Sequence, residues 1–244
     1  MPKASSSPDK CRHIGAGLQP ATVQAVRRLF RRLDYAGLGP IYCEEGGRAF
    51  WKDRRGPCEK LGLRLAMALR GRLIPGGRSL YVGAGVAELP LLVMETLELG
   101  RRVEAYTLRR AEAALLNEAC RGLPFRFSAR DGRLALGRYD HLCLTSVLND
   151  PERYPSLSAL SYGRADPASF DPIAFARERR TVRRLADACL RKVTRPGLIT
   201  TTVEEIRWIT LWCDRHRAPY LLEARTYPTA LVGDPVCFLR LSGR

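Results

Sequence analysis

The order of apolar and polar positions predicts alternating strands and helices along most of the chain. Residues 79–82 form a short apolar, β-prone run that passes through the turn Gly83-Ala84-Gly85 into a helical pattern ending near Gly100. The connection at 228–235 is too short for a crossover helix, so the last two strands should form an antiparallel hairpin. Further strands are predicted at 103–108, 125–129, 139–145, 197–203, 220–227 and 236–241, and helices at 111–120, 173–193 and 204–217.

The first 74 residues follow a different pattern. A helix is predicted at 21–33, with apolar residues on one face and Arg27, Arg28, Arg31 and Arg32 on the other. This arginine face is either a phosphate-binding surface or a solvated one. Residues 36–57 are turn-rich and residues 58–73 are helical in pattern, so the two segments together could cover a ligand cleft.

Three regions follow from these patterns. We expect a flexible tail at 1–18, an N-terminal helical cap region at 19–74 and an α/β domain at 75–244. Within the last region, the long segment at about 147–171 carries prolines and serines and is predicted to be irregular. A connection of that length is usually functional or disordered.

Composition places the chain among globular proteins, because 45% of its residues are hydrophobic. No apolar run approaches the roughly 20 residues that span a bilayer, and no apolar signal segment opens the chain. We therefore expect a cytoplasmic protein without a membrane partner. The formal charge of +16 would attract polyanions, but only five of the 41 basic residues are lysine, a skew that a GC-rich coding sequence also explains.

The cysteine and histidine pattern supports no metal site. The eight cysteines include no C-x-x-C pair, and no histidine and carboxylate cluster has ligand spacing, so no metal is predicted. Cys143, Cys189 and Cys237 lie in apolar runs and should be small buried hydrophobes. His141 lies inside an apolar strand and is interpreted as a core residue.

The glycine turn is the first candidate for chemistry. Glycine at 83 and 85 lets the backbone turn sharply and approach a ligand without an intervening Cβ. The free amides at the start of the following helix should then face that ligand.

Five strand–helix alternations closed by an antiparallel hairpin, over about residues 60–242, resemble the class I S-adenosylmethionine (SAM) dependent methyltransferases. The resemblance implies a Rossmann-like three-layer α/β sandwich with a mostly parallel seven-stranded sheet and SAM as cofactor. Its first motif matches L-Y-V-G-A-G-V-A, where Gly83 and Gly85 fit the first two glycines and Ala87 stands at the third. Tyr81 occupies the usual acidic position. The resemblance thus assigns cofactor contacts to Tyr81, Gly83, Ala84 and Gly85.

The later motifs place further residues around the same cofactor. Thr107 stands where the family has an acidic residue for the ribose hydroxyls, and Asp131-Gly132 stands where an aspartate commonly lies near the adenine amine. An ordinary Asp-Gly turn explains the second match equally well. The fourth motif, Y-D-H-L-C-L-T-S-V-L-N-D, implies that Ser146 lies beside the donor methyl group.

Methyl transfer from a sulfonium mainly requires alignment of the acceptor and exclusion of water. Asn149 or Asp150 could orient or deprotonate the acceptor, although N-D-P could also simply form a turn. Tyr154 and Tyr162, in the long segment, are predicted to line a small-molecule pocket with help from residues 36–57. The exocyclic-amine motifs of base methylases and the proline-cysteine pair of cytosine-ring methylases are absent.

The leading hypothesis is therefore a methyltransferase acting on a small molecule. RNA methylation is a second hypothesis, motivated by the arginine-rich helix at 21–33 and the net charge. A third is transfer of another group from a SAM-derived donor, as in aminopropyl transferases. The fourth is a non-catalytic scaffold, motivated by Tyr81 and Thr107 in the usual acidic positions.

Overall fold

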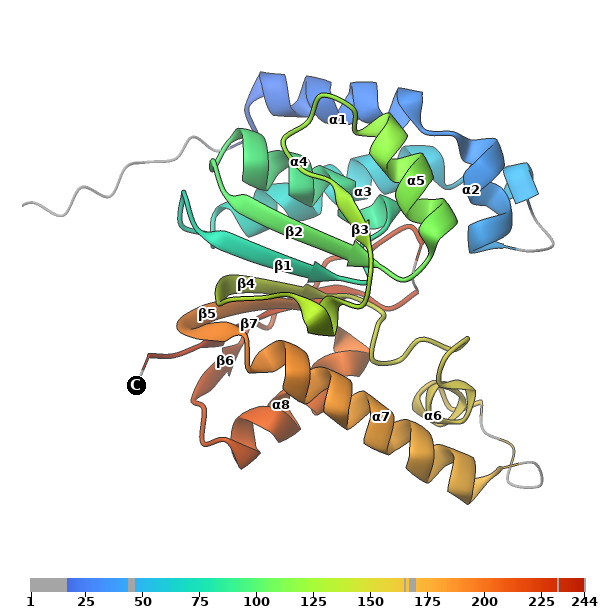
Figure 1. Ribbon diagram of the computed structural model, residues 1–244, viewed down its shortest axis with the longest axis vertical. Coiled ribbons are helices and arrows are strands. Elements are labelled where there is room, and N and C mark those ends of the chain that lie inside the picture. Colours follow the sequence, from blue (N-terminus) through green and yellow to red (C-terminus); the bar gives the residue numbers. More distant parts are fainter. Residues whose placement is uncertain (1–16, 44–46, 165, 167–169, 232, 244) are drawn as a thin grey trace, which may run out of the picture.

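The structure, a computed structural model, describes residues 17–43, 47–164, 166, 170–231 and 233–243 (Figure 1). The expected tail at 1–18 lies almost entirely outside these residues. A seven-stranded sheet forms the middle layer. Its strands are β1 (Arg78–Val82), β2 (Arg102–Thr107), β3 (Phe127–Ala129), β4 (Tyr139–Leu144), β5 (Val193–Thr202), β6 (Tyr220–Leu222) and β7 (Val236–Leu241).

The strand order is β3-β2-β1-β4-β5-β7-β6. The first five strands in this order run parallel, whereas β7 lies antiparallel to both β5 and β6. The predicted mostly parallel sheet with an antiparallel C-terminal hairpin is thus confirmed. The strand at 220–227 is shorter than predicted, because only a bridge between Tyr227 and Val236 continues the pairing beyond Leu222.

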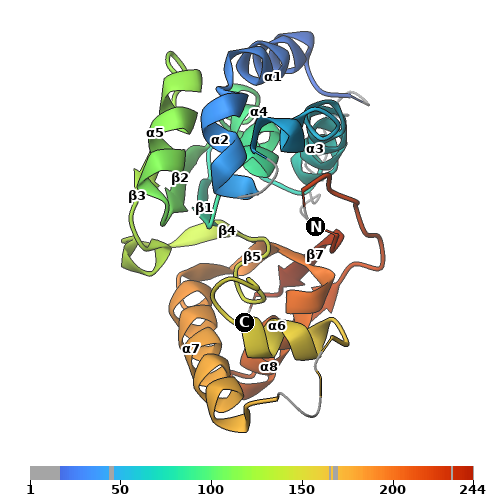
Figure 2. The same cartoon turned by 90° about the vertical axis from the view of Figure 1, so that its right-hand side faces the viewer.

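Helices cover both faces of the sheet (Figures 1 and 2). One face carries α1 (Pro20–Arg32), α2 (Tyr35–Tyr42), α3 (Arg55–Arg70), α4 (Leu89–Leu97) and α5 (Arg110–Ala119). The other carries α6 (Pro155–Ser161), α7 (Pro172–Leu190) and α8 (Ile206–Arg215). Short 3-10 turns lie at η1 (Gly47–Trp51), η2 (Val86–Glu88), η3 (Gly132–Leu134) and η4 (Val203–Glu205). None of the helices within the described ranges is long and apolar enough to cross a membrane.

The strand residues alternate between two cores. Tyr81 and Phe238 pack into the core beneath α1–α5, whereas Leu80 and Leu239 pack into the core beneath α7 and α8. This alternation follows from the two-residue period of a strand, and burial of both faces explains why apolar residues predominate in β1 and β7. The predicted burial of Cys143, Cys189 and Cys237 is confirmed.

Two helices arise where the local sequence pattern predicts none. At α2, the Asp34 carboxylate accepts hydrogen bonds from the amides of Ala36 and Gly37, both at 3.0 Å. At α6, Glu178 reaches across from α7 and accepts from the amide of Leu157 at 2.8 Å. Each carboxylate satisfies donors that a helix N-terminus would otherwise leave unpaired.

A charged network lies inside the core below β1 and β4. The side chains of Glu95 and Arg101 are fully buried and paired, with 2.8 Å between Oε2 and Nε. Oε1 of Glu95 accepts from Tyr81 Oη at 2.5 Å and lies 3.0 Å from His141 Nδ1. His141 is completely buried, as predicted for a core residue. Burial disfavours the charged form of Glu95, but His141 and Arg101 outweigh it and lower its pKa to about 2.

Removing the Glu95 charge should therefore be costly. Glu95→Gln should lower the free energy of unfolding by about 3–5 kcal/mol, because Arg101 Nε and His141 lose their buried carboxylate and Asp140 is left, among the described residues, as the only acid paired with Arg101. Because the pKa of Glu95 is lowered on folding, this stabilisation is complete above the ordinary value of 4.5 and fades toward about 2. Urea unfolding of both proteins across this pH range measures the difference.

The matched control is Glu118→Gln on α5, whose carboxylate pairs with Arg121 at the surface. Exposed pairs contribute about 1 kcal/mol or less. If both variants lost the same stability, the buried network would not be a major stabilising feature.

Candidate functional site

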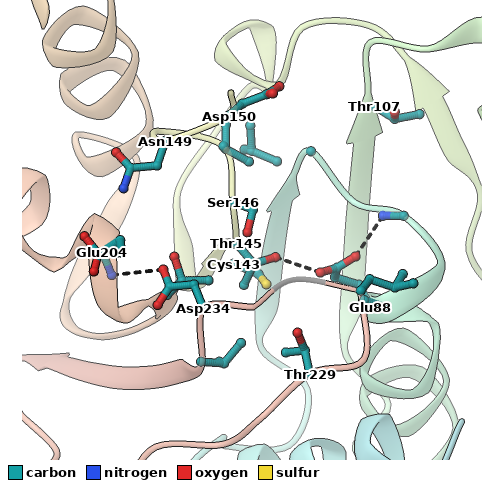
Figure 3. Close-up of a pocket in the computed structure, with 18 of the residues that line it drawn as sticks. Glu88, Thr107, Cys143, Thr145, Ser146, Asn149, Asp150, Glu204, Thr229 and Asp234 are labelled. Atoms are coloured by element: carbon teal, nitrogen blue, oxygen red, sulfur yellow. Dashed lines mark hydrogen bonds between the residues drawn. The ribbon is translucent and has the colours of Figure 1, made fainter. Parts of the chain in front are cut away.

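A cavity of about 1110 Å³ opens at the carboxyl ends of β1 to β5 (Figure 3). Its walls include residues of α3, the connection after β4 and the segment leading from Pro228 to Val236. Open α/β sheets bind ligands at this edge. This volume lies slightly above the usual range for small-molecule pockets, which is about 300–1,000 Å³.

The turn after β1 needs glycine at 83 and 85, because neighbouring side chains lie too close to leave room for a Cβ. Gly83 has a positive φ of 72°, and a Cβ there would lie 2.5 Å from Val147 Cγ2. A Cβ on Gly85 would lie 2.5 Å from the Tyr42 hydroxyl and 2.9 Å from Glu112 Oε1. Both glycines line the cavity.

The amides of this turn do not face the cavity as free donors, which contradicts the expectation from sequence. The amide of Gly85 donates to Glu88 Oε2 at 2.8 Å, and the amide of Val86 donates to Tyr42 Oη at 3.0 Å. The amide of Ala84 donates to a carbonyl of β2, and Ala84 does not line the cavity. At Ala84, Gly85 and Val86 the backbone therefore offers no free donor to a ligand.

Glu88 is the acidic group of the turn. Its Oε1 accepts from Thr145 Oγ1 at 2.7 Å, so the carboxylate joins the ends of β1 and β4 (Figure 3). Burial raises the pKa of Glu88, although these hydrogen bonds oppose the shift. Tyr81, at the position where the family has its acid, points the other way into the core and bonds Glu95. Tyr81 does not line the cavity.

At the end of β2, a carboxylate reaches Thr107 from the next helix. Thr107 Oγ1 donates to Glu112 Oε2 at 3.1 Å, and Glu112 Oε1 accepts from the Tyr42 hydroxyl. Both Thr107 and Glu112 are buried and line the cavity. Burial raises the pKa of Glu112. Thr107 therefore shares its position with an acidic group that lies five residues further along the chain.

At the end of β3, Asp131 caps the turn η3. Its Oδ1 accepts from the Arg133 amide at 2.9 Å and its Oδ2 from Arg133 Nε at 2.8 Å. These hydrogen bonds lower the pKa of Asp131. Gly132 packs against β1, where a Cβ would lie 2.8 Å from Val82 Cγ2. Asp131 and Gly132 both line the cavity, while the Asp-Gly turn is also present.

After β4, one carboxylate organises the chain. The buried Glu205 accepts from the amides of Ser146 at 3.1 Å and Val147 at 2.6 Å, and also from the amide of Leu148. Burial raises the pKa of Glu205. Ser146 has a positive φ of 57°, a conformation uncommon outside glycine. Glu205 holds this loop in the shape that places Ser146 at the cavity.

Asn149 and Asp150, the two residues expected to act on an acceptor, differ in burial and in hydrogen bonding. Asn149 is buried, and its Oδ1 lies 3.5 Å from Trp208 Nε1, while its Nδ2 has no partner. Asp150 is half-buried and caps the next turn, accepting from the Glu152 amide at 2.9 Å. Burial raises the pKa of Asp150. Figure 3 shows the Asp150 carboxylate directed away from Asn149.

Tyr154 and Tyr162 both line the cavity. Tyr154 is buried and also belongs to the core beneath α7, whereas Tyr162 is half-buried with the Arg164 guanidinium 5.0 Å from its ring centre. Within residues 36–57, Tyr42 lines the cavity. Trp51 instead packs against Tyr35, with ring centres 5.5 Å apart.

The sequence did not predict several residues of this site. Some are far along the chain from the motifs, and others lie a few residues beyond the motif position. The only local signal was the acidic residue in the first turn after β1 and after β2. The missed residues are Glu88, Glu112, Thr202, Glu205 and Asp234. No group of three or more histidine, cysteine or acidic residues suited to a metal ion occurs in the part of the chain that the structure describes.

No protein-family model matches the chain, and no curated protein matches it in sequence. Among solved structures, the magnesium protoporphyrin IX methyltransferase of Synechocystis PCC 6803, with bound SAM, matches with a TM-score of 0.52 at 10% identity. The match covers 86% of this chain and 98% of that one. The fold is that of the class I methyltransferases.

Other methyltransferases match with lower scores. The precorrin-6y C5,15-methyltransferase of Geobacter metallireducens GS-15 has a TM-score of 0.48 at 10% identity, over 74% of this chain and 89% of that one. TrmN of Thermus thermophilus has a TM-score of 0.44 at 20% identity, over 75% and 48%.

Within this class I fold, Glu205 should be essential to the loop after β4. Glu205→Leu leaves the buried Leu148 amide and the half-buried Ser146 and Val147 amides without their acceptor, and each unsatisfied buried donor costs about 1–3 kcal/mol. We expect a loss of at least about 3 kcal/mol in the free energy of unfolding. Hydrogen exchange at residues 146–148 should accelerate more than exchange in β1.

Glu204→Gln provides the control, because the Glu204 side chain takes no hydrogen bond within the described ranges while its neighbour Glu205 does. Unchanged exchange at 146–148 in Glu205→Leu would show that the loop holds its shape without this carboxylate.

Proposed function

We propose that the protein is a SAM-dependent methyltransferase that acts on a small molecule. One observation carries the proposal: the glycine turn, the Thr107–Glu112 pair and Asp131 line one cavity at the carboxyl ends of β1, β2 and β3. The residues present also fit the charge of SAM. Its sulfonium and ammonium groups are cationic, and Glu88 and Glu112 are buried carboxylates in that cavity.

Each part of the cofactor would have its own residues. Thr107 and Glu112 would hold the ribose hydroxyls, since a carboxylate oxygen that accepts one hydrogen bond can accept another. Asp131 and Gly132 would contact the adenine. Glu88 would lie nearest the methionine portion, beside the turn formed by Gly83 and Gly85.

Bound SAM supplies a methyl group that is already activated for transfer. The chain therefore needs to align an acceptor and to exclude water. The acceptor side is enclosed by the loop after β4, by the segment around α6 and by the segment from Pro228 to Val236, each of which contributes residues to the cavity wall. Such enclosure favours a small molecule over a surface-bound polymer.

Calorimetry with SAM tests the cofactor assignment. Glu112→Gln should weaken binding by about tenfold or more, because hydrogen bonds to a charged group are worth about 1.5–3 kcal/mol. Burial raises the pKa of Glu88 and of Glu112, and a bound cation favours their ionised forms. Affinity for SAM should therefore fall as the pH drops through these raised values, and binding should release protons.

Glu118→Gln, an exposed change on the same helix, should leave the affinity unaltered. Decarboxylated SAM and S-adenosylhomocysteine complete the comparison. Preference for decarboxylated SAM would favour an aminopropyl-type transferase. The absence of any binding heat for all three nucleosides would favour a non-catalytic scaffold and overturn the proposal.

RNA methylation is the second candidate, because the exposed Arg130, Arg153 and Arg164 lie at the cavity. If these arginines contact phosphates, the salt dependence of single-stranded RNA binding should fall by about 0.7 in log–log slope for each one neutralised. Anisotropy titrations at several salt concentrations measure this slope. An equal change on neutralising Arg27 and Arg31 of α1 would indicate non-specific attraction.

A further inference from the structure

We propose that the part of the cavity formed by the ends of β4 and β5 is the acceptor subsite, and that it selects a neutral group with an amide-like edge. Such an edge presents a hydrogen-bond acceptor next to an N–H donor. The inference rests on the proposed function for the role of the site, but the chemistry of the site is argued from the chain alone.

Three polar atoms in this part of the cavity are buried without a hydrogen-bond partner: Asn149 Nδ2, Thr202 Oγ1 and Ser146 Oγ. All three residues line the cavity, and Asn149 and Thr202 are 2% and 1% exposed. A buried polar atom without a partner is costly, and native proteins keep few of them. Because all three belong to residues that line the cavity, we infer that a ligand supplies the missing partners.

The Asn149 amide is oriented by its surroundings. Its oxygen lies toward the indole N–H of Trp208, at 3.5 Å, so its N–H2 group is the part left without a partner. That group only donates hydrogen bonds. It therefore requires an acceptor, such as a carbonyl oxygen, from the ligand.

Asp234 supplies the complementary half. It lies in the connection between β6 and β7, is 6% exposed and lines the cavity. Its Oδ2 accepts from the amide of Glu204 at 3.0 Å, and its other oxygen has no hydrogen bond within the described part of the chain. Figure 3 shows Asp234, Glu204 and Asn149 on one side of the cavity, opposite Thr107. A carboxylate oxygen of this kind accepts hydrogen bonds, so a ligand group that pairs with it would be a donor.

Charge argues against an anionic ligand at this wall. Burial first, and then the charges of Asp234 and Glu204, raise the pKa of Tyr162, which also lines the cavity. A carboxylate or phosphate group held here would meet Asp234 with no buried cation to offset it, since the arginines that line the cavity are largely exposed. A neutral carbonyl beside an N–H satisfies both Asn149 and Asp234.

Benzamide and benzoate form a matched pair of probes, because they share a ring and differ in the amide and carboxylate. Ligand-observed NMR should give benzamide a dissociation constant at least about tenfold lower than that of benzoate, with or without S-adenosylhomocysteine. Asn149→Leu and Asp234→Asn should each weaken the binding of benzamide at least about fivefold. Asp234→Asn should also reduce the ratio between the dissociation constants of benzoate and benzamide. Asp214→Asn, an exposed change on α8, is the control and should alter neither value.

Thr202→Val separates binding from folding. It removes a buried hydroxyl that has no partner, so the unfolding midpoint should stay level or rise while benzamide binding weakens. Three results would overturn the proposed subsite. Benzoate could bind as tightly as benzamide, or benzamide could fail to bind. Benzamide could also bind with unchanged affinity to Asn149→Leu, Asp234→Asn and Thr202→Val when these variants are folded. Calorimetry with SAM is independent of this result: binding of benzamide with the expected pattern but no binding of SAM would remove the proposed function and leave the subsite.

Discussion

The shape of the cavity depends on one buried acceptor. Three consecutive backbone amides after β4 converge on Glu205, and no water or exposed side chain is needed to satisfy them. This carboxylate lies just before α8, at the end of β5, so it ties the ends of two neighbouring strands together. The loop it holds places Val147 against Gly83 and carries Asn149 toward the acceptor side. Both sides of the cavity therefore inherit their geometry from Glu205.

Around this constraint, the two halves of the cavity differ in character. On the β1 and β2 side, polar atoms are already paired: Tyr42, Glu88 and Glu112 form closed contacts with the turn and with Thr107. On the β4 and β5 side, Asn149 and Thr202 are left with unsatisfied atoms. The first arrangement is preorganised, while the second keeps a cost that only a bound partner can remove. Under the proposed function, the β1 and β2 side would bind a cofactor that never changes, and paired polar atoms suit that role. The β4 and β5 side would select the acceptor, and unpaired polar atoms suit selection.

The sequence allowed much of the fold to be predicted, because period-two apolar runs and connection lengths are local properties. The hairpin follows from the length of 228–235, and the order of strands and helices follows from alternation. The helices α2 and α6 were not predicted, because Asp34 and Glu178 stabilise them through hydrogen bonds that hydrophobic periodicity does not reveal. Strand ends were also visible in the sequence, so Gly83, Thr107, Asp131 and Asn149 could be placed at one edge of the sheet.

The partners of those residues could not be placed in the same way. Glu205 and Asp234 meet the site through the sheet topology, from positions far along the chain. Tyr81 was assigned by its place in a motif, but strand alternation turns its side chain toward Glu95. Tyr42 shows a further consequence of long-range contact. Its hydroxyl accepts from Val86 and donates to Glu112, so helix α2 is fixed to the β1 and β2 side of the cavity. A shortened chain beginning at β1 would lose a wall of the binding site, and the N-terminal helices are therefore part of the smallest functional unit.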